Sequence, residues 1–219
     1  MSDSRQKRPY RSRLRKERAQ ATRQKILETA RRLFAERGYV ATTLPAIAAE
    51  AGVAVATVTA VFGTKLALLD ALIACAVRGD VEPAPIATRE WWQMMLREPD
   101  PSRQLALHAA NIRRIHERTT DLFEIVRGAA TAEPEIAALR RELGEGKLRD
   151  DQLVVESLAE KSALGGVTVE HGRDLLWALG SAELYRLFVV ERGWQPDQYE
   201  QWLAGAWTDA LLGPRGTQS

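Results

Sequence analysis

Apolar residues recur at helical spacing over most of the chain. In the first such run Ile26, Ala30 and Leu33 lie three or four positions apart, and Gly38 supplies a stop. Thr43 can cap a second helix, and Pro45 in its first turn costs no hydrogen bond. Further helices are expected at 55–62 and 65–78, and near 88–97, 102–127, 134–163, 169–191 and 196–212. No segment alternates with the period of two typical of strands, so the pattern predicts an all-α protein.

Charge divides the chain into two parts. Residues 1–65 carry 14 Lys and Arg against five Asp and Glu, whereas the remainder carries 17 against 24. Residues 1–18 are basic and polar and have no apolar period, so we expect a disordered arm there. The N-terminal part thus has a positive net charge and the remainder a negative one. This favours a nucleic-acid-binding N-terminal region joined to a body with a different role.

The composition argues against several classes of protein. Cys75 is the single cysteine, so neither an intramolecular disulfide nor a Cys-based zinc site can form, and a reducing compartment fits. The N-terminus is charged and lacks the apolar core of a signal peptide. No run of about 18 apolar residues is present, which argues against a membrane-spanning helix. We therefore expect a cytoplasmic protein without a membrane partner.

The segment 44–61 has the spacing of a helix-turn-helix. Ala48 lies where a second helix must approach closely, Gly52 permits a turn with positive φ, and Val58 packs into the angle between the helices. An ordinary corner between two helices of a bundle uses the same spacing. By itself the pattern leaves both interpretations open.

Three longer motifs surround this segment. They are I-L-x-x-A-x-x-L-F-A-E-R-G-Y, T-T-L-x-x-I-A-x-x-A-G-V and T-V-x-x-x-F-G-T-K-x-x-L-L, in this order between Thr22 and Leu69. In these motifs the chain resembles the DNA-binding domain of the TetR (tetracycline-repressor) family of transcriptional regulators. The resemblance implies a three-helix helix-turn-helix domain at 19–65 and a helical ligand-binding and dimerisation domain at 66–214, connected by helix 65–78. Beyond the motifs the chain resembles the family only in its helical sequence pattern and its length.

The expected recognition helix, 55–62, which is the reading helix that enters the major groove, has few polar side chains. The family usually has Tyr at the position of Thr59 and a phosphate-contacting side chain at Ala60 or Val61, and both are missing here. Threonine hydroxyls, a helix N-terminus and the basic arm can bind phosphates instead, although the arm can also be a solvated tail. The candidate DNA-binding residues are Arg11, Arg13, Arg15, Thr42, Thr43, Val55, Ala56, Thr57, Thr59, Ala60, Thr64 and Lys65.

No set of residues indicates an enzyme. The stretch E145-G-K-L148 lacks the remaining residues of a phosphate-binding loop, and H116-E-R-T-T120 lacks the second histidine of a zinc-protease helix. His108 and His116 can share a helix face, but no acidic residue stands at ligand spacing. We therefore expect no catalytic residues, no cofactor and no metal.

A cluster of aromatic and Met residues in the acidic part suits a ligand pocket, although each of them can equally be a core residue. The candidate pocket residues are Trp91, Trp92, Met95, His108, Asn111, Ile112, Ile115, His116, Phe123 and Trp177. The segment 174–190 is apolar on almost every face, so as a helix it must pack against its own domain on one side and against a partner on the other. Gly180, Ser181 and Ala182 are expected at the two-fold axis of the dimer. The candidate dimer residues are Leu175, Leu179, Ala182, Leu187, Trp202, Leu203 and Ala206.

The sequence thus predicts a homodimeric, ligand-responsive transcriptional regulator that binds a pseudo-palindromic double-stranded operator. Repression relieved by a small, mainly apolar effector is the expected mode. A regulator of the same fold that acts through protein contacts, without sequence-specific DNA binding, is the alternative. A helical small-molecule enzyme is a third class, and it lacks a catalytic constellation.

Overall fold

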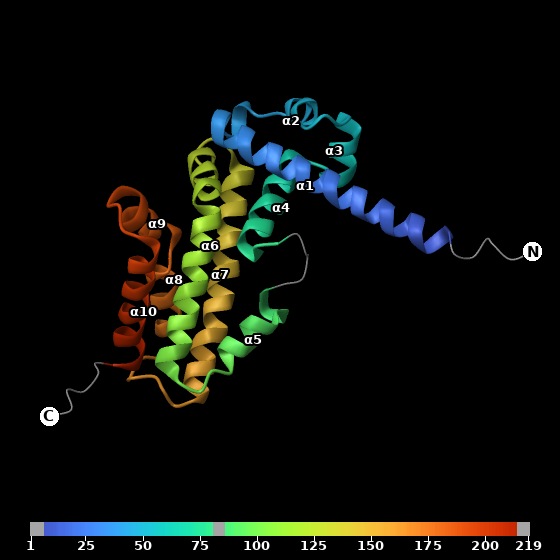
Figure 1. Cartoon of the computed structure of the whole chain (residues 1–219). Coiled ribbons are helices and arrows are strands. Elements are labelled where there is room, and N and C mark those ends of the chain that lie inside the picture. Colours follow the sequence, from blue (N-terminus) through green and yellow to red (C-terminus); the bar gives the residue numbers. More distant parts are fainter. Residues whose placement is uncertain (1–6, 81–85, 214–219) are drawn as a thin grey trace, which may run out of the picture.

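A computed structural model describes residues 7–80 and 86–213, except for the side chains of 7–14 and 87 (Figure 1). Its elements are α1 (Lys7–Ala41), α2 (Leu44–Ala51), α3 (Val55–Phe62), α4 (Lys65–Arg78), the 3-10 turn η1 (Ile86–Thr88), α5 (Glu90–Leu96), α6 (Pro101–Ala129), α7 (Pro134–Glu160), α8 (Val169–Leu179), α9 (Ala182–Tyr185), the π-helical turn η2 (Arg186–Glu191) and α10 (Pro196–Leu212). These residues contain no strand, and the all-α class is confirmed.

Helix α1 begins much earlier than the apolar pattern indicates. It is helical from Lys7, so residues 7–18 are helical where we expected a disordered arm, and the backbone leaves the helical conformation at the predicted stop, Gly38, with φ 76°. The stretch 10–20 contains no Gly or Pro, and nine of its eleven residues are Arg, Lys, Glu, Leu, Ala or Gln, whose helix propensity is high even without an apolar face. Figure 1 shows this end of α1 projecting away from the body of the protein.

Helices α2 and α3 form the expected corner. Thr43 caps α2 by accepting a hydrogen bond from the Ala46 amide, and Gly52 takes the left-handed conformation with φ 64°. Ala48 and Val58 are buried inside the angle. Within the described ranges no single helix is long and apolar enough to cross a membrane; only α2 and α3 taken together, bent by 113°, have that length and composition.

Two hydrophobic cores lie along the long helices α6 and α7. The first core joins α1–α4 to one end of this pair through residues such as Leu122, Val126 and Ile136. The second core joins the other end to α5, α8 and α10, with Trp207 and Tyr199 fully buried in it. Because the first core contains residues of α6 and α7, the N-terminal helices pack directly on the C-terminal part.

The expected continuous helix at 169–191 is interrupted. Helix α8 ends at Leu179, Gly180 leaves the helical conformation, and Ser181 caps α9 with its hydroxyl oxygen. A Cβ on Gly180 would lie 2.7 Å from Cζ2 of Trp207 in α10. The small residue therefore serves close packing within its own chain, and the prediction that Gly180 lies at a two-fold axis is wrong.

Candidate functional site

The outward face of α3 carries mostly small side chains. Val55, Ala56, Thr59 and Ala60 are exposed, while Val58 and Phe62 on the other face are buried in the first core. Thr57 is half-buried. This face offers a DNA base mainly methyl groups and the Thr59 hydroxyl, which matches the sequence expectation for a reading helix with few polar contacts.

Two exposed threonines lie at the N-termini of the flanking helices. Thr43 caps α2, and Thr64 caps α4 by accepting a hydrogen bond from the Ala67 amide. Each hydroxyl keeps its own proton for donation outward, and the first-turn amides of each helix carry the positive end of its dipole. Both positions are suited to bind a phosphate oxygen.

Two of the expected DNA contacts are engaged inside the protein. Thr42 is completely buried, and its hydroxyl donates to the carbonyl oxygen of Gly38 at 2.8 Å, so the prediction that Thr42 contacts DNA is wrong. Lys65 is half-buried. Its ammonium donates to the Tyr39 carbonyl oxygen at 2.9 Å and lies 4.1 Å from the centre of the Tyr39 ring. Lys65 therefore closes the carboxyl end of α1, and a phosphate would have to share its ammonium.

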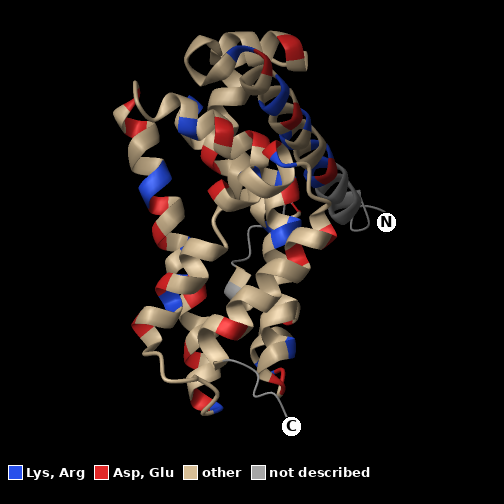
Figure 2. Ribbon diagram, turned by 90° about the vertical axis from the view of Figure 1, so that its left-hand side faces the viewer, with Lys and Arg blue, Asp and Glu red and all other residues tan. Residues whose placement is uncertain are grey.

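Basic residues recur along α1 (Figure 2). Arg15 is exposed, whereas the side chains of Arg11 and Arg13 lie outside the described residues. Lys25, which the sequence analysis did not select, is exposed and lies beside the turn between α2 and α3. Its Nζ is 3.6 Å from the position that a Cβ on Gly52 would take. No sequence signal marked Lys25, because its place beside the turn depends on how α1 packs on α2.

Two neighbouring cavities open between the helices of the C-terminal part. The first, here named the α4 cavity, lies between α4, α5, α6 and α7 and has a volume of about 400 Å³. The second, the α9 cavity, lies between α6, α7, α8 and α9 and has a volume of about 420 Å³. Both sizes are in the range of small-molecule sites. Of the expected pocket residues, those in the wall of the α4 cavity are Trp91, Trp92, His108, Asn111, Ile112, Ile115, His116 and Phe123.

The other two expected pocket residues lie elsewhere. Met95 is buried in the second core, where its sulfur is 3.5 Å from Nδ2 of Asn111. Trp177 lines the α9 cavity and donates from Nε1 to the Gly144 carbonyl oxygen at 3.2 Å. The sequence therefore grouped into one pocket residues that the fold distributes over a cavity wall, a core and a second cavity.

The wall of the α4 cavity contains a charged cluster of Asp151, His108 and Lys147 that the sequence did not indicate. Asp151 is fully buried and lies 3.2 Å from Nε2 of His108, while the ammonium of Lys147 binds its other oxygen. Burial opposes ionisation of Asp151, but the positive charge of Lys147 and the hydrogen bond from His108 outweigh it and hold the pKa of Asp151 below its usual range. Since an ionised carboxylate only accepts, Nε2 of His108 carries a proton.

His116 belongs to the wall between the two cavities and lines both. Its Nε2 donates to the carbonyl oxygen of Gly180 at 3.1 Å. Burial lowers the pKa of His116 to about 4, so the ring is neutral at physiological pH. Phe123, Leu143 and Lys147 also line both cavities, so the partition between them consists of these four side chains.

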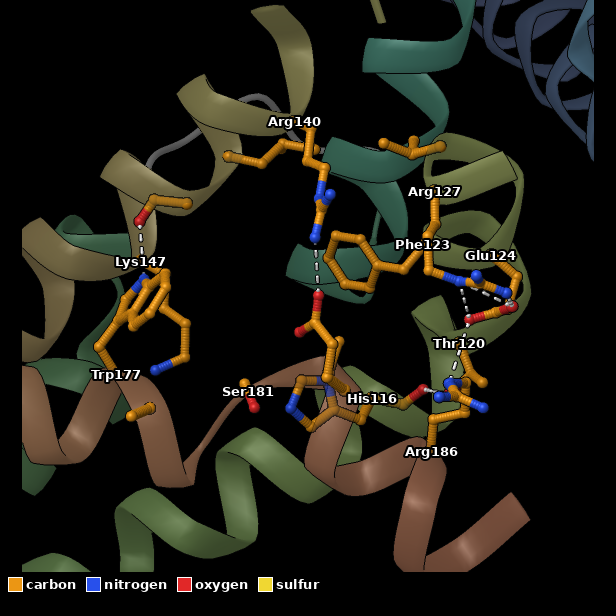
Figure 3. A pocket seen from close by; sticks show the side chains of 16 residues that line it. His116, Thr120, Phe123, Glu124, Arg127, Arg140, Lys147, Trp177, Ser181 and Arg186 are labelled. Atoms are coloured by element: carbon orange, nitrogen blue, oxygen red, sulfur yellow. Dashed lines mark hydrogen bonds and ion pairs between the residues drawn. The ribbon is translucent and has the colours of Figure 1, made fainter. Parts of the chain in front are cut away.

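The α9 cavity is framed by ion pairs (Figure 3). Arg140 of α7 binds Glu183 of α9 at 3.1 Å, and Glu124 of α6 binds Arg127. Arg186 lies 3.5 Å from Glu124. Each charged side chain in this frame has an opposite charge beside it, so the frame presents no uncompensated charge to a ligand.

Polar contacts tie α1 and α4 to α6 and α7. Arg31 of α1 forms two hydrogen bonds to the carboxylate of Asp121 at 2.6 and 2.8 Å. Arg118, also on α6, donates to the carbonyl oxygens of Ala76 and Val77 at the end of α4, at 2.7 and 3.0 Å. These contacts lie between the DNA-binding helices and the α4 cavity, whose wall also includes the last turns of α4.

The expected dimer residues differ in how far they are covered within the chain. Leu203 is completely buried in the second core, so its assignment to an interface is wrong. Leu187 is exposed. The remaining expected dimer residues are half-buried and retain some outward surface: Leu175, Leu179, Ala182, Trp202 and Ala206.

Comparisons with known proteins now assign the N-terminal part. Residues 26–72 match the family model described as bacterial regulatory proteins, tetR family. The N-terminal domain belongs to the tetR family. The matched segment begins at the buried Ile26 within α1, ends at Leu72 in the middle of α4, and includes the whole helix-turn-helix. No curated protein matches this chain by sequence.

Solved structures share the fold over nearly the whole chain. A TetR-family transcriptional regulator from Syntrophomonas wolfei is 19% identical, with a TM-score of 0.73 over 91% of this chain and 99% of that one. The SmeT–triclosan complex is 17% identical, with a TM-score of 0.69 over 91% and 100%. NalD of Pseudomonas aeruginosa, a repressor of a multidrug efflux pump, is 21% identical, with a TM-score of 0.66 over 90% and 98%. The chain therefore has the fold of TetR-family transcriptional regulators.

Proposed function

We propose that the protein is a homodimeric, ligand-responsive transcriptional regulator, most simply a repressor that leaves its operator when a small molecule occupies the α4 cavity. It has neither a catalytic role nor a cofactor in this proposal. The observation that supports the proposal most strongly is that α4 belongs both to the core of the DNA-binding helices and to the wall of the α4 cavity. This helix contacts the DNA-binding helices through the first core, and its last turns line the α4 cavity. The ligand-bound SmeT structure and the repressor NalD, which share the fold, support it.

The mechanism follows from packing. A molecule in the α4 cavity contacts Ile73 and Val77 of α4 on one side and Ile112 of α6 on the other. If it binds better when α4 is displaced, it shifts α4, and α3 moves with it because both belong to the first core. In a dimer this changes the distance between the two reading helices and thereby the affinity for an operator with fixed half-site spacing.

Arg118→Met is expected to weaken the coupling between effector and DNA. The substitution keeps an apolar stem on α6 but removes both hydrogen bonds to the end of α4. We expect the effector-induced change in operator affinity to shrink by roughly tenfold, while each ligand alone still binds. Arg113→Met on the same helix is the matched control, because Arg113 pairs with Glu117 and Glu200. Equal coupling in both variants, measured by operator titration with and without effector, would contradict this route.

The homodimer in this proposal uses the outer faces of α8 and α10. Leu175 and Leu179 of α8 and Trp202 and Ala206 of α10 are half-buried and keep part of their surface exposed. Gly205 lies beside them on α10 and has no atom within 4 Å of the position a Cβ would take. Small residues on an outward helix face permit close approach of a second copy around a two-fold axis.

Gly205→Arg is expected to produce a folded monomer. Within the chain the added side chain meets nothing near its Cβ, and a helical Gly is less favourable than other residues. In the proposed interface the same side chain would bury a charge and block the approach of the partner helix. Gly128→Arg is the matched control, because Gly128 in α6 is equally open but lies away from that face. A Gly205→Arg protein that sediments as the wild type does would exclude this interface.

The deciding experiment is selection of bound sequences from random double-stranded DNA. A regulator should enrich a pseudo-palindromic site, and addition of an effector should release it. Binding that is weak, uniform across sequences and lost at physiological salt would favour the alternative, a protein of this fold that acts through protein contacts. The small outward side chains of α3 are the observation that keeps this alternative open.

A further inference from the structure

The helix-turn-helix lacks the side chains that commonly distinguish one base from another. From Leu44 to Val61 the chain contains no Arg, Lys, Asn, Gln or His, and its single charged residue is Glu50. Glu50 is engaged by Arg32 of α1 at 2.7 Å. Guanine and adenine are identified through paired hydrogen bonds from Arg, Lys, Asn or Gln, and the amino group of cytosine through Glu or Asp. The reading helix therefore cannot identify a base by such paired hydrogen bonds.

The basic side chains near the reading helix belong to its neighbours α1 and α4. Lys25 lies beside the turn that precedes α3, and the ammonium of Lys65 is held at the end of α1. The guanidinium of Arg23 lies 4.6 Å from the centre of an aromatic ring at the end of α3. Thr43 and Thr64 cap the flanking helices. Because phosphate contacts from such groups position a protein on the duplex but carry no base sequence, another contact must supply selectivity.

The outward face of α3 is mainly apolar. Val55, Ala56 and Ala60 are exposed, and Val55 keeps 43% of its surface accessible. Thr59 adds a hydroxyl, which can donate or accept and therefore distinguishes bases poorly. The apolar group that a base pair offers in the major groove is the C5 methyl of thymine. Since A·T and G·C pairs present equally many polar groups there, the methyl is what an apolar face can detect.

We propose that α3 selects its operator through thymine methyl groups, which lie against Val55, Ala56 and Ala60 in the major groove of each half-site. This inference rests on the proposed function and specifies the DNA that it recognises. The small side chains allow the helix to approach the base edges closely, and each buried methyl then adds an apolar contact that cytosine does not provide. Phosphate contacts from the neighbouring helices supply the remaining affinity.

Deoxyuridine tests this inference directly, because it pairs as thymine does and lacks only the C5 methyl. In the operator obtained by selection, the thymines are replaced one at a time, and the affinity of the full chain is measured by fluorescence anisotropy. We expect about fourfold weaker binding at several positions in each half-site, as for the loss of one buried methyl group. Thymines outside the half-sites are the control, and their replacement should have no effect.

Cytosine provides the converse test. A cytosine put in place of a sensitive thymine, with guanine opposite, should weaken binding because it lacks the methyl. The same operator with 5-methylcytosine at that position should bind more tightly than the unmethylated one, since the modification restores the methyl in the major groove. Equal affinity for the two would contradict methyl recognition.

A double-mutant cycle assigns the contact to a side chain. Val55→Ala removes both γ-methyl groups, so the loss caused by deoxyuridine at the base facing this residue should fall from about fourfold to less than about twofold. Val61→Ala is the matched control. Val61 is 39% exposed on the same helix but lies at its carboxyl end, whereas the N-terminal residues of a recognition helix contact base edges. Both valines are exposed, so neither substitution removes a core residue.

Salt dependence separates methyl contacts from phosphate contacts. A methyl group releases no counterion, so the thymine and deoxyuridine operators should give the same slope of log affinity against log salt. A slope that changes with the base would mean that the replacement alters phosphate contacts, and it would contradict this inference.

The outcomes also separate this inference from the proposed function. Selected half-sites without thymine, deoxyuridine effects below about 1.5-fold at every position, or full deoxyuridine effects at every position in Val55→Ala would overturn the inference. The proposed function would still stand, because a selected operator would exist however it is read. It would fail if no sequence were selected.

Discussion

Asp151→Ala is expected to lower the free energy of unfolding by about 3–5 kcal/mol, the typical cost of removing one partner from a buried ion pair. Asp151 is fully buried and holds the ammonium of Lys147 on one oxygen and the His108 ring on the other. The alanine leaves the ammonium of Lys147 without its counter-charge and the Nε2–H of the buried His108 without an acceptor. Urea unfolding at pH 7, followed by circular dichroism, measures the loss.

The neighbouring carboxylate supplies a matched control. Asp150→Asn should leave the stability unchanged or raise it at pH 7, because the folded protein raises the pKa of Asp150 to about 6 and its ionised form is therefore unfavourable. Lys147→Met added to Asp151→Ala should recover part of the loss, since it removes one unpaired buried charge. If Asp151→Ala lies within about 1 kcal/mol of the wild type, the cluster is not the stabilising contact that its geometry indicates.

Removal of residues 1–16 is expected to lower operator affinity by roughly 500-fold at about 0.1 M salt. The truncation deletes seven basic residues, at positions 5, 7, 8, 11, 13, 15 and 16. If three of them contact phosphates, the slope of log affinity against log salt should become shallower by roughly three units, about 0.9 for each contact. The outward face of α3 has no basic side chain, so the basic N-terminal segment should carry an unusually large share of the binding.

A shorter truncation is the control for this experiment. Removal of residues 1–6 deletes only Arg5 and ends before α1, so its salt slope should differ from that of the full chain by at most one contact. An unchanged slope after removal of residues 1–16 would mean that the segment does not touch DNA. Lys25, beside the turn between α2 and α3, would then be the next basic residue to replace.

The sequence by itself determined those features that depend on neighbours along the chain. Thr43 as a cap, the left-handed Gly52 and the buried Ala48 and Val58 follow from rules that act over a few residues, and the structure confirms them. The motifs between Thr22 and Leu69 identified the family for the same reason. The apolar period failed at residues 7–18, where helix propensity rather than a buried face favours the helix, and at 169–191, where the helix is interrupted at Gly180.

The tertiary structure decided everything that requires a distant partner. Thr42 is buried against the end of α1 and cannot reach DNA, and the ammonium of Lys65 is held by Tyr39, 26 residues before it, so a phosphate would have to share it. His108 lacked an acidic partner in the sequence because Asp151 is 43 residues away. Trp207 occupies the space beside Gly180 that sequence pattern assigned to a second copy of the chain. A sequence shows that a residue is small, charged or aromatic, but burial and pairing arise only when separate helices pack together, so the chemistry of the cavity is a property of the fold.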